Sequence, residues 1–276
     1  MKSINCKGTL IDLSSPKVMG ILNITPDSFF DGGKYNNPSA IINHIEKMLS
    51  EGATFVDVGA YSSRPGAKHI SEEEELARII PVIKLLIEEF PKLLISVDTF
   101  RGSIAEQCIQ LGACMINDIS AGNMDKNMFA TVAKLQVPYI MMHMQGNPQT
   151  MQAKPTYANI VQELLYYFSK KINEIRSLGV NDIIADVGFG FGKTLEQNYE
   201  LLKHLALFKN LDVPTLVGLS RKSMLFKPLE INQNKALNAT TSANTIALLN
   251  GANMLRVHDV KEAVEAIKIV ELLNKN

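Results

Sequence analysis

The sequence predicts an α/β fold, a single (β/α)8 TIM barrel with a short N-terminal β-hairpin, and three observations support this prediction. The chain has 276 residues, a length that suits one barrel of this kind. From Lys17 onward, a unit of a short apolar strand, a polar loop and an amphipathic helix recurs. No linker or low-complexity tract divides the chain, so we expect one domain over residues 1–276. A doubly wound open sheet is the structural alternative.

The expected barrel strands are apolar on both faces, as parallel strands covered by helices should be. They span residues 18–22, 55–59, 94–98, 115–118, 139–142, 183–186, 215–219 and 254–257. Residues 3–15 alternate weakly between apolar and polar, and we expect them to form a hairpin that covers the bottom of the barrel.

Capping residues mark where several helices begin. Asn37 followed by Pro38 predicts an N-cap with proline at the first helical position. Capping boxes or their acidic variant are expected for Ser71 with Glu74, Thr194 with Gln197, and Asp259 with Glu262.

Bulk composition excludes several classes of protein. Lys plus Arg and Asp plus Glu number 28 each, so no overall field attracts nucleic acid or an anionic membrane. The three cysteines show no C-x-x-C spacing, which favours a reduced cytoplasmic compartment without a disulfide framework or zinc site. No apolar run is long enough to span a membrane.

Polar residues stand at the carboxyl end of every expected strand, where the chemistry of this fold takes place. Asp98, Asn117 and Asp186 come from three different strands and are expected to meet at one rim. Two carboxylates and an amide suit a ligand edge rich in N–H donors, such as a guanidine-like heterocycle. The alternative is that Asp98 or Asp186 caps the helix that follows it.

The stretch of residues 186–193 carries glycine at every second position from Gly188 to Gly192. Glycine allows positive φ and a close approach of the backbone to a flat ligand. The stretch nearly matches a phosphate-binding P-loop, but Val187 stands where that pattern requires its first glycine. A glycine-rich turn leading into a helix is the plainer reading, and it leaves Asp186 unexplained.

Three basic residues near strand ends are candidate phosphate ligands: Arg64, Arg256 and His258. Arg256 and His258 stand at alternate positions by the last strand, where phosphate sites of this fold often lie. Two long loops, residues 23–33 and 62–66, contain Gly, Pro and Ser and are expected to act as lids. His143 is expected in the pocket wall rather than in a metal site.

On these residues, the chain resembles the dihydropteroate synthase family along essentially its whole length. The matching signatures are residues 20–33, 59–66, 96–99, 117–120, 142–146, 186–193, 218–223 and 256–258. Val187 stands where the family often has proline, and Ser63 where threonine is common. The resemblance implies an enzyme of folate biosynthesis, a sulfonamide target and a homodimer.

The resemblance also implies a reaction, in which 4-aminobenzoate displaces diphosphate from 7,8-dihydropterin-6-ylmethyl diphosphate and gives 7,8-dihydropteroate. Asn23 would help to ligate Mg²⁺, which the diphosphate carries. The implied catalytic residues are Asp98, Lys222, Arg256 and His258. The implied substrate-binding residues are Ser63, Arg64, Asp98, Asn117, Met141, Asp186, Phe191, Lys222, Ser223, Arg256 and His258. The implied lid residues are Thr25, Pro26, Asp27, Ser28, Phe29 and Pro65.

Because the amine nucleophile is neutral and weakly basic, no strong general base is required, and we expect dissociative substitution. The growing charge of the leaving group calls for Mg²⁺, arginine and helix N–H groups. The rival functions are a corrinoid-type pterin-binding methyltransferase domain and an inactive pterin-binding paralogue. The first would lack the two lids and the Arg221-Lys222-Ser223 run.

Overall fold

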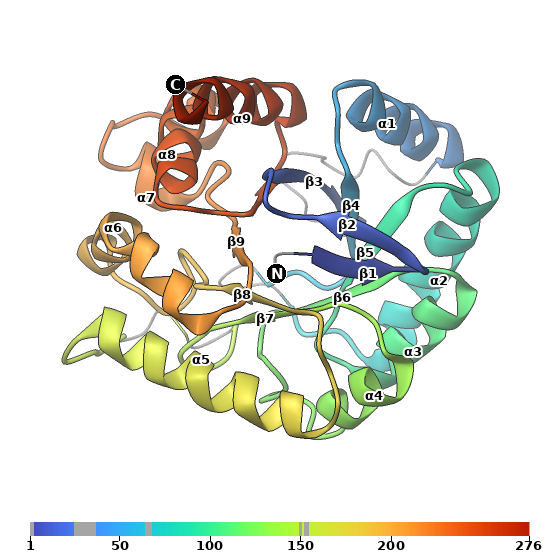
Figure 1. Cartoon of the computed structure of the whole chain (residues 1–276). Helices are drawn as coiled ribbons and strands as arrows, with labels where there is room; N and C mark the ends of the chain where they lie inside the picture. Colours follow the sequence, from blue (N-terminus) through green and yellow to red (C-terminus); the bar gives the residue numbers. More distant parts are fainter. Residues whose placement is uncertain (1–2, 25–36, 64–67, 149–150, 152–154, 276) are drawn as a thin grey trace.

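The computed structural model describes residues 3–24, 37–63, 68–148, 151 and 155–275. Within them, the parallel strands close into a barrel in the order β10-β3-β4-β5-β6-β7-β8-β9, with helices around it (Figure 1). The last strand of the chain pairs with the first barrel strand, with Leu255 opposite Val18. This pairing confirms the barrel and excludes the open doubly wound sheet.

The barrel strands lie close to the predicted ranges. They are β3 (Lys17–Asn23), β4 (Phe55–Gly59), β5 (Leu94–Asp98), β6 (Met115–Asp118), β7 (Tyr139–Met142), β8 (Ile183–Asp186), β9 (Thr215–Val217) and β10 (Met254–Val257). Strand β3 is longer than predicted by one residue at each end. Strand β9 ends two residues early because the carbonyl of Leu219 accepts from Lys222 N in a turn, at 3.1 Å, instead of extending the ladder.

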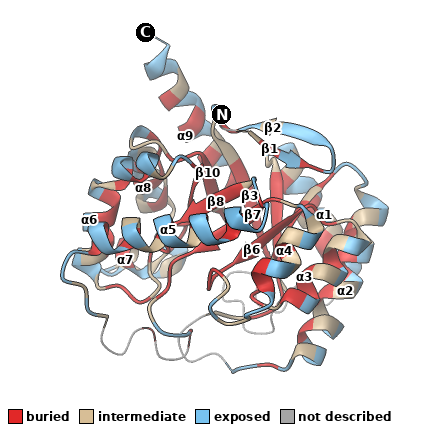
Figure 2. Ribbon diagram, turned by 60° about the horizontal axis from the view of Figure 1, so that its bottom comes forward, coloured by how far each residue is buried: buried red, intermediate tan, exposed pale blue. Residues whose placement is uncertain are grey.

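Helices cover the outside of the barrel with one apolar face each. They are α1 (Pro38–Ser50), α2 (Glu72–Glu89), α3 (Gly102–Leu111), α4 (Met128–Leu135), α5 (Ile160–Ser177), α6 (Leu195–Lys203), α7 (Ser223–Phe226), α8 (Leu237–Leu249) and α9 (Val260–Asn274), with 3-10 turns at Leu205–Leu211 and Gln233–Lys235. In α1, Ile41, Ile45 and Met48 share one face and are buried. Figure 2 shows the same division of buried and exposed residues along α5. Over the described ranges, no helix has both the length and the apolar character needed to cross a bilayer.

Three of the four expected helix starts are confirmed. The side chain of Asn37 accepts from Ser39 N, and that of Ser71 accepts from Glu74 N. Thr194 and Gln197 form the full reciprocal capping box. The box predicted at Asp259 is wrong: α9 has no side-chain cap, because the Asp259 carboxylate binds the Arg221 guanidinium at 2.7 and 2.9 Å.

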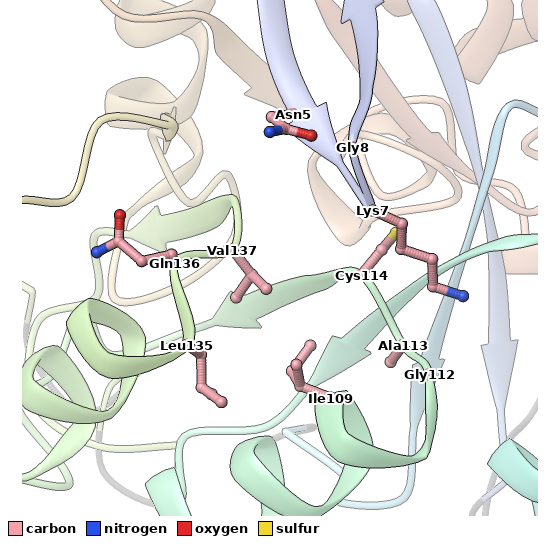
Figure 3. A pocket seen from close by; sticks show the side chains of 10 residues that line it. All are labelled: Asn5, Lys7, Gly8, Ile109, Gly112, Ala113, Cys114, Leu135, Gln136 and Val137. Atoms are coloured by element: carbon pink, nitrogen blue, oxygen red, sulfur yellow. The ribbon is translucent and has the colours of Figure 1, made fainter.

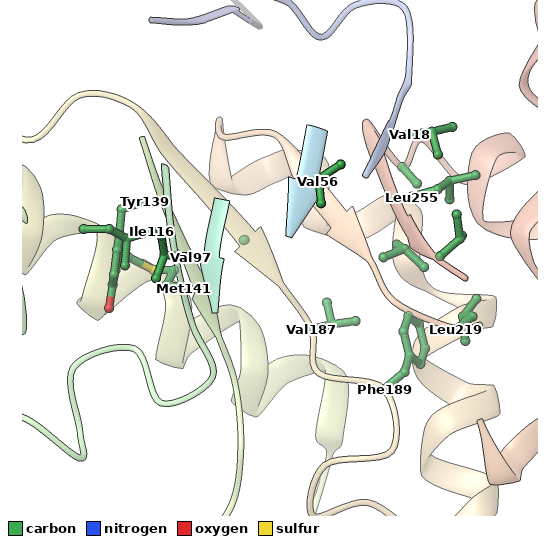
Figure 4. Close-up of a cluster of buried hydrophobic side chains, with 14 of the residues drawn as sticks. Val18, Val56, Val97, Ile116, Tyr139, Met141, Val187, Phe189, Leu219 and Leu255 are labelled. Carbon is green, nitrogen blue, oxygen red and sulfur yellow. The ribbon is translucent and has the colours of Figure 1, made fainter. Parts of the chain in front are cut away.

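Two apolar layers hold the barrel together. The larger one lies between strands and helices, and Figure 4 shows part of it, including Val97, Tyr139 and Met141. The smaller one fills the lower half of the barrel interior with side chains such as Met19, Phe55 and Ile184. Because successive side chains of a strand point to opposite faces, each strand contributes alternate residues to the two layers.

The N-terminal hairpin, β1 (Ser3–Cys6) with β2 (Thr9–Asp12), covers the bottom of the barrel as predicted (Figure 1). Ile4 and Cys6 of the hairpin are buried in the lower interior layer. The backbone N–H of Asn5 donates to the Asp182 carboxylate at 2.9 Å, and the Asn253 amide donates to the carbonyl of Leu13 at 2.9 Å. The hairpin is therefore fixed to the ends of distant strands.

A cavity of about 300 Å³ lies beside the hairpin, below the starts of β6 and β7 (Figure 3). Its lining includes Lys7, Cys114 and Val137. This is the end of the barrel opposite to the carboxyl ends of the strands, so the cavity is separate from the polar residues described next.

Candidate active site

The strand register turns the predicted polar residues toward the inside of the barrel at its carboxyl end. Asp98 lies opposite Asn117 on the neighbouring strand, and Asp186 lies opposite Met142. Neither carboxylate caps a helix: α3 has no side-chain cap, and α6 is capped by Thr194. The capping alternative is therefore excluded for both residues.

Arg256 lies between two carboxylates of the barrel interior. Its Nε donates to Asp57 Oδ2 at 2.6 Å, and its Nη2 donates to Asp98 Oδ2 at 2.8 Å. The Asn117 amide nitrogen also donates to Asp57 Oδ2, at 2.9 Å, which leaves the Asn117 amide oxygen for another donor. Burial opposes the charge on Arg256, but Asp57 and Asp98 outweigh it and raise the pKa of the guanidinium.

The pKa of Asp98 is strongly raised. Burial raises its pKa to about 7, against the attraction of Arg256, although 19% of its side-chain surface stays exposed. Repulsion from Asp57 acts in the same direction as burial.

Asp57 is a site residue that the sequence analysis missed. It is fully buried in β4, and its Oδ1 has no hydrogen-bond partner among the described residues. The signal was present, since one carboxylate interrupts the otherwise apolar run Phe55–Gly59. Charged residues of this kind are almost never fully buried unless paired.

The loop after β8 places Asp186 next to Lys222. Asp186 Oδ1 accepts from Gly188 N at 2.8 Å, and burial raises the pKa of the carboxyl against the opposing effect of Lys222. Lys222 Nζ donates to the carbonyl of Phe189 and lies 4.6 Å from the centre of the Phe191 ring. Burial lowers the pKa of Lys222 to about 8, although Asp186 acts to raise it.

Positive φ at the three glycines of this loop is confirmed, at 69°, 81° and 60° for Gly188, Gly190 and Gly192. A Cβ atom on Gly188 would lie 2.1 Å from the carbonyl oxygen of His143. The glycines thus let the loop after β8 pack directly on the backbone of the loop after β7. Val187, the departure from the family pattern, is fully buried in the layer between strands and helices.

His258 and Ser220 meet at the ends of β10 and β9. The His258 Nδ1 atom lies 2.9 Å from Ser220 Oγ, which also accepts from the backbone N–H of His258 at 3.2 Å. Asp259 and the first turn of α9 follow directly. Ser220 therefore fixes the imidazole beside the start of a helix, where backbone N–H groups favour anions.

Met141 does not lie in the site, contrary to our expectation. It is fully buried between strands and helices with Tyr139, on the outer face of β7 (Figure 4). The inward position belongs to the next residue, Met142, which packs with Tyr61 and Phe100 above the barrel. A strand reverses its side chains at every residue, so an error of one position moves a side chain out of the site.

The other predicted residues are placed as follows. Asn23 ends β3, Ser63 lies in the loop after β4, Phe191 is in the loop after β8, and Ser223 begins α7. Seven predicted residues lie outside the described residues: Thr25, Pro26, Asp27, Ser28, Phe29, Arg64 and Pro65.

No group of three or more His, Cys, Asp or Glu side chains suited to a metal occurs in the described part of the chain. Asn23 ends β3 and brings one neutral oxygen ligand to the carboxyl end of the barrel. Mg²⁺ keeps several waters and is usually bound through one or two carboxylates plus substrate phosphates, so a single amide oxygen can serve only together with the oxygens of a substrate. The donor set thus fits a Mg²⁺ ion that arrives with a diphosphate.

Comparisons with known proteins agree with this geometry. The family model described as "Pterin binding enzyme" matches residues 19–258. The dihydropteroate synthase of Escherichia coli (strain K12) is 43% identical over 267 residues, which cover 96% of this chain and 94% of that protein. A crystal structure of Yersinia pestis dihydropteroate synthase in a sulfonamide drug complex superposes with a TM-score of 0.95, at 41% identity over 99% of this chain and 100% of that one.

A second solved relative is the Xanthomonas albilineans dihydropteroate synthase with 4-aminobenzoic acid, with a TM-score of 0.90 at 36% identity, covering 99% of this chain and 98% of that one. Both the family model and the full-length relatives span the strand-end residues described above. The chain therefore belongs to the pterin-binding enzyme family, among its dihydropteroate synthases.

Proposed function

We propose that the chain joins 7,8-dihydropterin-6-ylmethyl diphosphate to 4-aminobenzoate at the carboxyl end of its barrel. The observation that carries this proposal is the meeting of Asp98, Asn117, Asp186 and Lys222 at one rim. In the reaction, the bond between the methylene carbon and the diphosphate oxygen breaks, and the electron pair leaves with the diphosphate. The amine then forms the new C–N bond and loses a proton.

The pterin is held by complementary hydrogen bonding. Asp186 uses Oδ1 for Gly188 and so offers Oδ2 to the N–H groups of the ring edge. The side-chain nitrogen of Asn117 donates to Asp57, so the side-chain oxygen is the atom that can accept a hydrogen bond from the ring. Lys222 supplies a cationic donor, and Phe191 supplies a ring face next to it. A buried charge-assisted set of this kind gives both affinity and orientation.

The Asp57–Arg256–Asp98 cluster supplies the electrostatics of the step. As the diphosphate departs, positive charge develops on the methylene carbon and spreads into the pterin, and the Asp98 carboxylate stabilises it. The two carboxylates engage Nε and one N–H of Nη2, so N–H groups of Nη1 and Nη2 are left to face the leaving group. Positioning and preorganised charge thus account for the rate.

The leaving group is received by His258, Ser63 and the first turn of α9. Asn23 would hold the Mg²⁺ ion of the substrate, and that ion neutralises growing negative charge when it is bound. Ser223 would meet the carboxylate of 4-aminobenzoate. The lids of residues 25–29 and 64–65 would enclose this second pocket.

Three further properties belong to the same proposal. The Yersinia pestis relative was solved with a sulfonamide drug, and we propose that sulfonamides occupy the aminobenzoate pocket of this chain as well. We also propose that the chain forms a homodimer and works in the cytoplasm. Sedimentation of the purified protein tests the dimer.

The test of the function is a coupled assay for diphosphate release, run with and without 4-aminobenzoate. Release that depends on both substrates, with formation of dihydropteroate, is the expected result. Asp186→Asn serves as the matched inactive control. Methyl transfer to a corrinoid without diphosphate release would instead support the rival methyltransferase, and pterin binding without turnover would support the inactive paralogue.

Pterin affinity is expected to rise with pH around neutrality. Asp98, whose pKa burial raises to about 7, is protonated below that pH and becomes a full acceptor above it. One proton released on binding changes affinity by at most about tenfold per pH unit. Titration calorimetry with 6-hydroxymethylpterin from roughly pH 6 to roughly pH 8 measures the slope. Because Lys222 titrates nearby, Asp98→Asn is the control. If the dependence of pterin affinity on pH is unchanged in that variant, the effect comes from another group.

His258→Ala is expected to lower turnover of the diphosphate substrate on the order of 100-fold, as the loss of one donor to a developing anion does. Affinity for 6-hydroxymethylpterin should stay near the wild-type value, because the His258 imidazole is held by Ser220 beside the start of α9. Ser220→Ala should give a smaller loss of the same kind. Equal weakening of the pterin and the diphosphate substrate would place His258 in the pterin pocket.

A further inference from the structure

Lys193 is a buried lysine in the glycine loop; burial lowers the pKa of its ammonium to about 7, although Asp186 acts to raise it. Its side chain is 4% exposed, and Nζ donates to the carbonyls of Phe191, Gly188 and His143 at 2.9, 3.0 and 3.2 Å. The Nδ1 atom of His143 lies 3.1 Å from the same nitrogen. Among the described residues Lys193 forms no salt bridge, so backbone oxygens and one imidazole provide its whole hydrogen-bonding environment.

The imidazole of His143 is suited to accept from this ammonium. Burial and the charge of Lys193 lower the pKa of His143 to about 3, so the ring is neutral. A neutral imidazole can present an unprotonated Nδ1 as an acceptor. His143 also packs edge-on against Tyr167, which fixes its orientation.

The bonds of Lys193 join two loops that form the pterin site. Gly188 and Phe191 belong to the loop after β8, and His143 belongs to the loop after β7. Gly188 in turn donates to Asp186, and the Phe191 ring lies beside Lys222 Nζ. Through these contacts the ammonium fixes two parts of the pterin site without facing the ligand.

We propose that Lys193 is a positioning residue of the pterin site, holding the loops after β7 and β8 in the shape that presents Asp186 and Phe191 to the ring. This inference rests on the proposed function. The side chain turns back into its own loop and does not extend outward as the lysine of a P-loop does. Its positive charge lies close enough to Asp186 to favour the ionised carboxylate.

Lys193→Met tests the inference, because it keeps the length of the side chain and removes the donors. We expect pterin affinity to fall, and KM for the pterin substrate to rise, by on the order of tenfold. The reason is that three buried carbonyls lose their hydrogen-bond donor. The affinity for inorganic pyrophosphate and kcat should change much less. Lys203→Met, on the exposed side of α6, is the matched control and should match wild type.

Tyr157→Phe provides a second, milder variant in case Lys193→Met does not fold. It removes a 2.9 Å bond to the carbonyl of Gly192 in the same loop, and it should weaken pterin binding by a few fold. Unchanged pterin affinity in both variants would overturn the inference, as would parallel losses of pterin and pyrophosphate binding in Lys193→Met. An inactive wild-type protein would instead contradict the proposed function.

Discussion

Asp186→Asn is expected to weaken pterin binding by about 2–4 kcal/mol, or roughly 30-fold to 1,000-fold. The amide can still accept from Gly188 N, as Asp186 Oδ1 does at 2.8 Å. Its NH₂ group then stands where Oδ2 stood and faces the N–H donors of the ring. A charge-assisted pair is lost, and two donors meet in a site where Asp186 is only 7% exposed.

Calorimetry with 6-hydroxymethylpterin measures this loss directly. Asp182→Asn is the matched control, because Asp182 lies just before the other end of β8 and accepts from Asn5 N of the hairpin. That variant should bind the pterin normally. A change below about tenfold in Asp186→Asn would mean that the carboxylate mainly stabilises the turn to Gly188.

Arg256→Met is expected to lower the free energy of unfolding by about 3–5 kcal/mol and to abolish measurable turnover. The guanidinium lies between Asp57 and Asp98, so its removal leaves the buried Asp57 and the half-buried Asp98 without a cation. Breaking a buried pair by removing one partner costs more than the pair itself contributes. Urea unfolding measures the stability, and diphosphate release measures the turnover.

The double variant Arg256→Met with Asp57→Asn separates the two effects. Neutralising Asp57 removes the like-charge repulsion, so stability should recover by about 1–3 kcal/mol relative to the single variant. Turnover should not recover, because the guanidinium that faces the diphosphate is still absent. A double variant no more stable than Arg256→Met would show that the loss of stability comes from another contact of Arg256.

Most of the barrel could be predicted because each strand is a short apolar run that ends in polar residues. The rim residues Asp98, Asn117 and Asp186 followed from that pattern alone. The pattern selects residues at strand ends, and Asp57 was missed because it lies inside its strand. The Asp259 cap failed because a long-range partner, Arg221, uses the same carboxylate. Residue types show what a side chain can bind, whereas the fold decides which partner it meets.

The proposed role of Lys193 could not be predicted from the sequence, for the same physical reason. A lysine after a glycine-rich turn suggests an outward-facing cation, yet the positive φ of Gly188, Gly190 and Gly192 curls the loop so that carbonyls surround it. Backbone conformation, rather than side-chain chemistry, determines which way this residue faces.

The attachment of the hairpin has a consequence for how the chain folds during synthesis. The backbone N–H of Asn5 bonds to Asp182, and the carbonyl of Leu13 bonds to Asn253. The N-terminal hairpin therefore cannot complete these contacts until the later residues have been synthesised. Contacts between such distant residues form slowly, since a long loop must close before they contribute. Asn5 and Leu13 leave the ribosome before Asp182 and Asn253, so they reach these partners late, and until then the lower interior of the barrel stays open to water.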